Sequence, residues 1–246
     1  MEEIAGVSMN ENKPLLITIS NDKWMDNHLR RWHRYAKKYS GCRLGLIAIT
    51  ENDALLWELM SAFDKVVVFN NSFDERKFYN KVRLMAPELF GEPVIYCDAD
   101  ADIWASLVSV MEEVKADGVE VACIKSPAPH KDWAKFKCGE VEVNNGFLVL
   151  NYGKERTKEI VETYNKMHDQ VIEAGGNPRI SGTIGFNKMF WDSDIKGVVL
   201  KYDNSVIWWD TLNLQNAKVI QWCNDWGQAK RLALNNDWIR GRGLFE

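Results

Sequence analysis

Residues 94–104 of this 246-residue chain read VIYCDADADIW, a strand-like run that is followed by three aspartates. Its first four residues are apolar and β-prone and follow a proline, which is typical of a buried strand. Asp98 and Asp100 come directly after that strand. Ligands of open α/β sheets bind beyond the carboxyl ends of the strands, and carboxylates at i and i+2 of an extended chain point the same way. The stretch therefore predicts a polar site in which two carboxylates share one hard cation, Mg²⁺ or Mn²⁺.

The alternative is a solvated acidic turn, in which Asp102 helps to cap a helix that begins near Trp104. Around this stretch, short apolar segments alternate with amphipathic ones, which predicts an α/β fold with a mostly parallel central sheet and helices on both faces. No linker or repeat divides the chain, so we expect one Rossmann-like domain over residues 1–246. The expected strands are 15–20, 44–50, 66–69, 94–97, 119–124, 141–151, 198–202, 206–209 and 219–222, and the expected helices are 24–39, 54–63, 74–90, 104–115, 154–173, 186–191 and 226–238. Between them, residues 126–140 have no clear period, which is typical of a lid or of a surface loop.

Composition limits the functional classes. The net charge of -4 argues against a general nucleic-acid binder, which needs a basic face, without excluding a local basic patch. No apolar run approaches the length of a membrane span, and the first twelve residues are too acidic and polar for a secretory signal. Five cysteines without a CxxC pair predict reduced thiols, with Cys42, Cys97 and Cys123 in or beside the core. The simplest prediction is a cytoplasmic protein.

Three blocks, in order, resemble one family. YCDAD at 96–100 is similar to the aspartate-x-aspartate motif of GT-A glycosyltransferases, especially the glycogenin and bacterial lipopolysaccharide galactosyltransferase group. KVRL at 81–84 stands on the preceding helix, where that group carries a donor-contacting lysine. NNGFLVLN at 144–151 resembles the group's asparagine-small-glycine strand beside the donor sugar. The order and spacing match over about residues 15–151.

The resemblance implies a metal-dependent glycosyltransferase with a GT-A fold. Residues 12–124 would form the nucleotide-binding half, and residues 125–246 the donor-sugar and acceptor half with a C-terminal helix. The donor would be a nucleotide-diphosphate sugar, most simply a UDP-sugar, the acceptor a saccharide or another hydroxyl compound, and the cofactor Mn²⁺ or Mg²⁺. The residues carried over are Asp100 and Lys81 for catalysis, and Asp98, Asn144, Asn145, Gly146 and Lys230 for donor binding.

Without the resemblance, Lys81 is a solvated helix lysine, and Asn144 to Gly146 are a turn at a strand entry. The C-terminal third departs from the family pattern, because residues 219–230 contain no histidine to complete the metal site. We expect Asp98, Asp100 and Asp225 as metal ligands, with Gln221 or Asn224 as the alternatives to Asp225. The family's acidic-glutamine motif is also absent, since residues 181–187 read SGTIGFN.

The resemblance is to retaining enzymes, in which the departing phosphate can take the acceptor proton. An inverting enzyme would need a side-chain base, for which the candidates are Asp210, Asp225 and His130. Six of the 11 tryptophans lie in the final third, where one or two can form a platform for an acceptor sugar while the others pack in the core. They are Trp191, Trp208, Trp209, Trp222, Trp226 and Trp238.

Three other functions are weighed against this one. A sugar-phosphate nucleotidylyltransferase needs a glycine-rich loop after the first strand, and residues 20–24 have none. A non-catalytic nucleotide-sugar or carbohydrate-binding module would explain the missing histidine. A viral-type glycosyltransferase acting on DNA bases is disfavoured by the acidic net charge.

Overall fold

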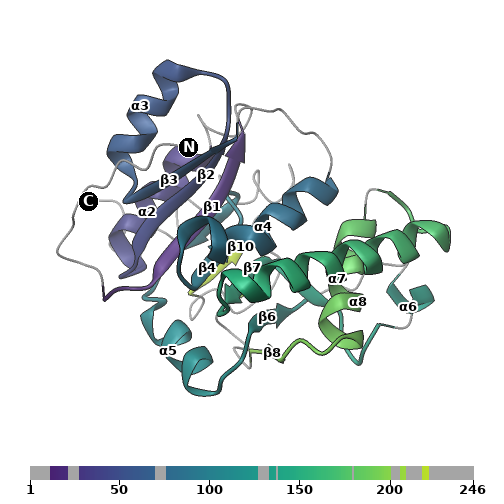
Figure 1. Ribbon diagram of the computed structural model, residues 1–246. Coiled ribbons are helices and arrows are strands. Elements are labelled where there is room, and N and C mark those ends of the chain that lie inside the picture. The colour runs from purple at the N-terminus through teal and green to yellow at the C-terminus, as the bar shows by residue number, and fades with distance from the viewer. Residues whose placement is uncertain are drawn as a thin grey trace.

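The structure is a computed structural model that describes residues 12–21, 28–69, 76–126, 133–136, 138–178, 180–200, 206–208 and 218–221. Within these residues, a seven-stranded sheet has the order β3-β2-β1-β4-β7-β6-β8 (Figure 1). Four of its six strand pairings are parallel, and β7 runs antiparallel to both of its neighbours. The predicted α/β class with a mostly parallel sheet is therefore confirmed. The strands are β1 (Leu15–Asn21), β2 (Arg43–Ile49), β3 (Lys65–Phe69), β4 (Val94–Cys97), β6 (Val121–Lys125), β7 (Val143–Leu150) and β8 (Gly197–Val199).

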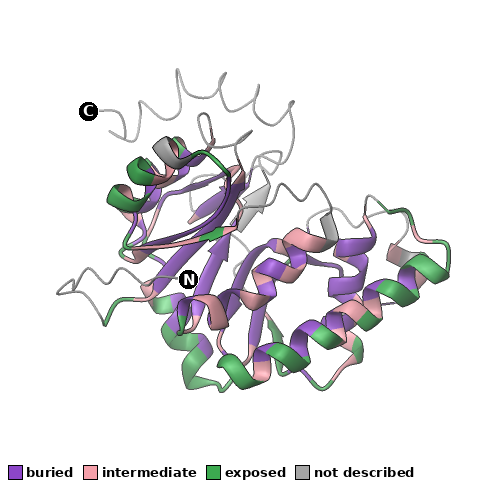
Figure 2. Ribbon diagram, turned by 45° about the horizontal axis from the view of Figure 1, so that its top comes forward, coloured by how far each residue is buried: buried purple, intermediate pink, exposed green. Residues whose placement is uncertain are grey.

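Helices cover both faces of the sheet, as predicted (Figure 1). Successive side chains of a strand point to opposite faces, so Leu15 and Ile17 of β1 enter one apolar cluster while Leu16 enters the other. The inner strands β1, β2, β4, β6 and β7 are buried almost throughout, whereas the edge strands β3 and β8 are half-buried or exposed (Figure 2). Helix α7 is buried only along its inner side, and most of α8 is buried. One face carries α2 (Arg30–Tyr39), α3 (Asp53–Ala62) and α5 (Val108–Ala116), the other carries α4 (Arg76–Phe90), α7 (Lys154–Glu173) and α8 (Ser181–Asp192), and α6 (Trp133–Phe136) is a single short turn.

A second, three-stranded sheet was not predicted as such. It pairs β5 (Ala101–Ile103) with β10 (Val219–Gln221) and β9 (Val206–Trp208). The predicted helix 104–115 is wrong at its start, because Ala101–Ile103 is a strand, the Trp104 amide donates to the Lys218 carbonyl at 2.7 Å, and the helix begins at Val108. Pairing with a strand near the C-terminus decides the conformation here, over the local preference for a helix.

Other boundaries differ less. The strand 94–97 and the helix 154–173 have the predicted bounds, and the helix predicted at 186–191 already begins at Ser181. The predicted irregular segment 126–140 contains α6, and the predicted helix 226–238 lies outside the described residues. No described helix has the length and apolarity that a bilayer span requires. Cys42, Cys97, Cys123 and Cys138 are free thiols, in agreement with the prediction for the first three.

Candidate functional site

The acidic pair lies in a turn that leaves β4. The Asp98 amide donates to the Gly146 carbonyl at 2.8 Å and closes the β4–β7 ladder, and the Ala101 amide donates back to the Asp98 carbonyl at 3.1 Å. The expectation of an extended i, i+2 pair is therefore wrong. The chain has to turn here because the next residues form β5 in the second sheet.

Asp98 is surrounded by donors from three different parts of the chain. Its Oδ1 accepts from Arg83 Nη2 at 2.7 Å and from the Tyr96 hydroxyl, and its Oδ2 accepts from Gln221 Nε2 at 2.8 Å. The Arg83 guanidinium also lies over the Tyr96 ring, 4.8 Å from its centroid.

The protonation of these groups follows from their surroundings. Burial is the strongest single influence on Arg83 and works to lower its pKa, but the charge of Asp98 and the interactions with Tyr96 and Tyr164 together outweigh it and raise that pKa. Burial raises the pKa of Tyr96 well above its ordinary value, so its hydroxyl stays a donor. Asp98 thus accepts three hydrogen bonds, one of them from a charged guanidinium.

Asp100 has the opposite character. Its Oδ1 is buried and has no hydrogen-bond partner among the described residues. Burial, followed by the negative charge of Asp98, raises the pKa of Asp100 to about 7, against the opposing charges of Arg31 and Arg83. A buried carboxylate oxygen without a donor is where a cation would bind most favourably.

The third aspartate of the stretch is structural. Asp102 is fully buried in β5 and pairs with Arg31 of α2, whose Nε lies 2.7 Å from Oδ1. The alternative of a solvated turn in which Asp102 caps a helix is thus overturned. The ion pair instead ties α2 to the strand that follows the acidic turn.

The Asn-Asn-Gly block meets the acidic turn from β7, where the register of the β6–β7 ladder shifts. Asn144 is buried, and its Oδ1 accepts from the Gly146 amide at 2.6 Å, which shapes this irregularity. Asn145 Nδ2 donates to Asn80 Oδ1 at 2.8 Å, and the same oxygen accepts from Arg83 Nη1 at 3.0 Å. Asn80, Arg83 and Asn145 thus form one polar network beside Asp98.

Position 146 has to be glycine because the side chains of Gln221 and Asp98 lie against its backbone. A Cβ at this position would overlap Gln221 Nε2 and would lie 2.6 Å from Asp98 Oδ2. The missing side chain allows β10 to reach the acidic turn. The strand-entry turn and the binding role proposed for this block are therefore compatible, and the binding role stays a prediction.

Asp98, Asp100 and Gln221 carry the side-chain oxygens that a divalent cation could use at the acidic turn. Within the described residues, no third acidic, histidine or cysteine side chain joins Asp98 and Asp100 in a cluster that could hold a metal. Gln221 Oε1, on β10, is buried and has no hydrogen-bond partner among these residues, and the same holds for Asp100 Oδ1 in the turn. Oxygen donors suit Mg²⁺ or Mn²⁺, so the residues present fit such an ion. The predicted ligand Asp225 and the predicted phosphate contact Lys230 lie outside the described residues.

Sequence reasoning chose Lys81 and missed Arg83. Lys81 lies on α4 two residues before Arg83, about 200° around the helix from it. Among the described residues it is Arg83 that contacts Asp98, and the role of Lys81 stays a prediction. The available signal was the i, i+3 spacing of Asn80 and Arg83, which places both on one side of the helix before the motif strand. Gln221, named from the sequence as an alternative to Asp225, is brought to Asp98 by the pairing of β10 with β5.

Other predicted residues are placed as follows. Trp191 is partly buried and donates its indole N–H to the Val141 carbonyl at 3.0 Å, which is a packing role. The side chains of the other five tryptophans, His130 and Asp210 lie outside the described residues. Asn21, at the carboxyl end of β1, donates to the Tyr79 hydroxyl at 2.7 Å, while its Oδ1 is buried and unpartnered within the described residues.

Comparison with known proteins places this geometry in a fold family. A crystal structure of the galactosyltransferase LgtC in complex with donor and acceptor sugar analogues superposes with a TM-score of 0.64 over 94% of this chain and 100% of that one. The chain has the GT-A fold. Sequence identity to LgtC is 12%, so the likeness establishes the fold alone. No protein-family model matches the sequence, and no curated protein matches it.

Proposed function

We propose that the protein is a glycosyltransferase that transfers a sugar from a nucleotide-diphosphate sugar, most simply a UDP-sugar, to a hydroxyl of a saccharide or similar acceptor. The observation that carries this proposal is the buried Asp100 Oδ1, which has no hydrogen-bond partner among the described residues, beside the hydrogen-bonded Asp98 at the carboxyl end of β4 in a GT-A fold. The edge of the sheet beyond β1 and β4 is where open α/β folds bind nucleotides.

The residues have different tasks in this proposal. Asp100, Asp98 and Gln221 would hold a Mg²⁺ or Mn²⁺ ion, with Asp225 as a further candidate ligand, and this ion supplies positive charge for a leaving nucleoside diphosphate. Arg83 and Tyr96 hold Asp98 in place, so that the turn need not rearrange when the charge develops. Asn145 donates one amide N–H to Asn80, and its second amide N–H and its side-chain oxygen would bond to sugar hydroxyls.

The reaction needs no side-chain base if the departing phosphate accepts the acceptor proton. We therefore propose retention of the donor's anomeric configuration. Proton NMR of the first product measures the anomeric coupling, and a β-linked product from an α-linked donor contradicts this part and directs the search to Asp210, Asp225 and His130.

Calorimetry tests donor binding. We expect UDP to bind in the presence of Mn²⁺ and not after its removal by a chelator, and Asp100→Ala to weaken binding by about 100-fold or more. Asp117→Ala is the matched control, because Asp117 is an exposed carboxylate on the far end of α5. Absence of binding by any nucleoside diphosphate, with or without a cation, contradicts the proposal.

A turnover assay separates the enzyme from a non-catalytic binding module. Two observations favour the module: the missing histidine, and the absence within the described residues of a third acidic, histidine or cysteine side chain to complete a metal-binding cluster. Release of UDP from a UDP-sugar, with or without an acceptor, supports the transferase. Tight binding with no release under any acceptor identifies the module.

A further inference from the structure

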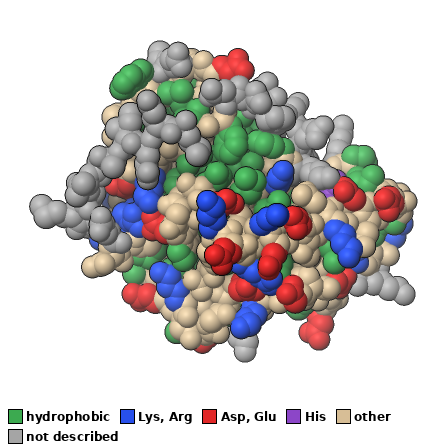
Figure 3. All heavy atoms as spheres, viewed as in Figure 1, with side chains coloured by type: hydrophobic (Ala, Val, Ile, Leu, Met, Phe, Trp, Pro, Cys, Tyr) green, Lys and Arg blue, Asp and Glu red, His purple; other side chains and the backbone are tan. Residues whose placement is uncertain are grey.

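The outer face of α2 and α3 gathers cations in a chain whose net charge is negative. The α2 sequence, RRWHRYAKKY, contains no acidic residue. Trp32, Tyr35 and Ala36 face the core, which leaves Arg30, Arg34 and Lys37 at i, i+4 and i+7 along the exposed ridge, with Lys38 beside them. The face that carries α7 differs, because acidic and basic side chains alternate over it (Figure 3).

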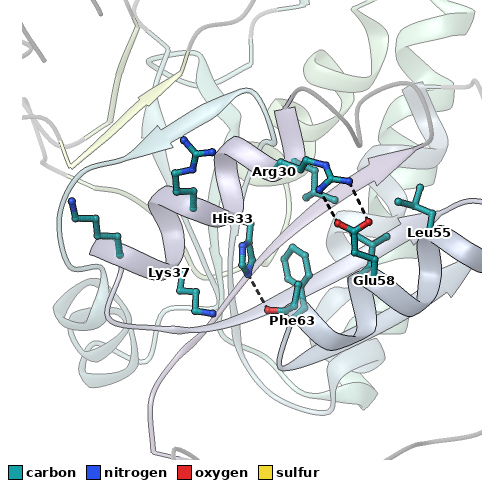
Figure 4. A pocket seen from close by; sticks show the side chains of 11 residues that line it. Arg30, His33, Lys37, Leu55, Glu58 and Phe63 are labelled. Carbon is teal, nitrogen blue, oxygen red and sulfur yellow. Dashed lines mark hydrogen bonds and ion pairs between the residues drawn. The ribbon is translucent and has the colours of Figure 1, made fainter. Parts of the chain in front are cut away.

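A groove of about 540 Å³ runs between the two helices, with an apolar floor and a cationic rim. Leu55, Leu59 and Phe63 contribute to the floor, and the α2 cations stand along one side (Figure 4). Glu58 is the one acidic residue in the lining, and it pairs with Arg30 at 2.7 Å. The rim therefore keeps a net positive charge.

The groove walls are fixed relative to each other. His33 Nε2 lies 2.9 Å from the Ala62 carbonyl oxygen, and the His33 and Phe63 rings are 4.9 Å apart between centroids (Figure 4). Together with the Arg30–Glu58 pair, these contacts join the first turn of α2 to the second half of α3. The charged ridge is thus displayed on a rigid surface.

Two exposed apolar side chains lie on α3, the helix next to the α2 cations. Trp57 is 73% exposed and Met60 is 40% exposed, and they lie at i and i+3 on the outward side of α3, so neither closes the groove. A tryptophan that projects from the helix next to a row of lysines and arginines matches the interface of an anionic bilayer, where indole rings sit at headgroup level and cations meet phosphates. A nucleic-acid or acidic-protein partner would use the cations but would leave the projecting Trp57 without a role.

We propose that the α2–α3 face docks on an anionic phospholipid surface. Arg34, Lys37 and Lys38 contact the headgroup phosphates, and Trp57 and Met60 enter the interfacial layer. This docking is independent of the proposed transfer reaction, since it uses none of the residues of the acidic turn.

Vesicle co-sedimentation tests the proposal with the full chain. Vesicles of phosphatidylcholine with one quarter phosphatidylglycerol are expected to bind the protein at low salt, and pure phosphatidylcholine vesicles are not. Replacing three cations, in Arg34→Gln/Lys37→Gln/Lys38→Gln, is expected to lower the partition coefficient about 100-fold, at about 5-fold per cation. Raising the salt to about 0.5 M should have a similar effect.

The matched control is Lys154→Gln/Lys158→Gln/Lys166→Gln, which removes the same charge from exposed positions of α7. We expect this control to bind vesicles within about 2-fold of the parent. Trp57→Ala should weaken binding about 5-fold at unchanged charge. UDP calorimetry on each variant should be unchanged, so failure of docking and failure of the proposed function are distinguishable.

Several outcomes overturn the proposal. One is absence of binding to the anionic vesicles, and another is an equal loss in the α7 control. Retention of duplex DNA or of a polyglutamate peptide by the α2 ridge, without vesicle binding, assigns the face to a polyanionic macromolecule instead.

Discussion

The acidic turn after β4 and the outer face of α2 and α3 both gather charged side chains, but they differ in how many of these charges are paired within the chain. Around Asp98, each carboxylate oxygen accepts hydrogen bonds, and Arg83 is bonded to Asp98, Asn80 and the Asn145 carbonyl. Among the described residues that line the α2–α3 groove, Glu58 is one carboxylate against four cations. Matched charge in a partly buried setting stabilises the structure, whereas unmatched charge at the surface costs little and remains available to a ligand.

Asp100 is the exception within the matched region, because its buried oxygen has no partner among the described residues. In the two proposals, Asp100 and the α2 ridge are alike in that each binds a ligand of opposite charge, a divalent cation at Asp100 and headgroup phosphates at the ridge. The following experiments test the contrast between matched and unmatched charge, from the largest expected effect to the smallest.

Asp100→Asn should change how stability depends on pH in the absence of divalent cations. The folded-state pKa of about 7 is above the ordinary value of 3.8 for this side chain, so the neutral form is favoured by folding. Stability from this group is therefore complete below about pH 4 and is lost as the pH rises through 7. The loss is at most about 4 kcal/mol, and the asparagine variant should not show it.

Urea unfolding of both proteins with a chelator at pH 5 and pH 8 measures this difference. At pH 8 the variant should be the more stable protein, and the gap should shrink at pH 5. Asp117→Asn, at an exposed position, is the control and should follow the parent at both pH values. Identical pH profiles for parent and Asp100→Asn would mean that Asp100 is not a desolvated carboxyl.

Arg83→Met should destabilise the protein by about 3 kcal/mol, because it leaves the Asp98 carboxylate and Asn80 without their charged donor. Arg83→Lys should recover part of this loss, since lysine restores the charge without the planar fork. Chemical denaturation gives the stabilities. A loss below about 0.5 kcal/mol for Arg83→Met would mean that the Arg83–Asp98 pair stabilises the protein no more than an exposed ion pair does.

Gly146→Ala should cost about 2 kcal/mol, because the added methyl group overlaps Gln221 and crowds Asp98. Gly153→Ala is the control, since an added Cβ there meets no atom within 4 Å. In the double variant Gly146→Ala/Gln221→Ala, the overlap with the amide is removed and part of the stability should return. Additive losses in this double-mutant cycle would contradict the contact between β7 and β10.

Arg34→Gln/Lys37→Gln/Lys38→Gln should change the free energy of unfolding by less than about 1 kcal/mol, since all three side chains are exposed. The same denaturation assay applies, with the α7 triple variant as reference. A loss as large as that of Arg83→Met would show that the ridge is part of the structural framework and not a binding face.

Much of the architecture could be predicted from local pattern. The buried β4 strand, the helix 154–173 and the alternation of strands and helices follow from runs and periods of apolar residues. The position of Asp98 and Asp100 at a strand end was also readable, as was the placement of Asn144 to Gly146 on a neighbouring strand. These features depend on residues that are close in sequence, where hydrophobic burial and chain direction decide the outcome.

The partners in the site were decided by tertiary structure. Gln221 reaches Asp98 because β10 pairs with β5, and after that pairing the expected helix start at residues 104–107 is a loop. Arg83, and not Lys81, meets Asp98 because of how α4 is rotated against the sheet. Local sequence determined which segments are strands and where the acids stand, whereas the difference between the bonded Asp98 and the unpartnered Asp100 arises only when distant segments exclude water and supply donors to one carboxylate but not the other.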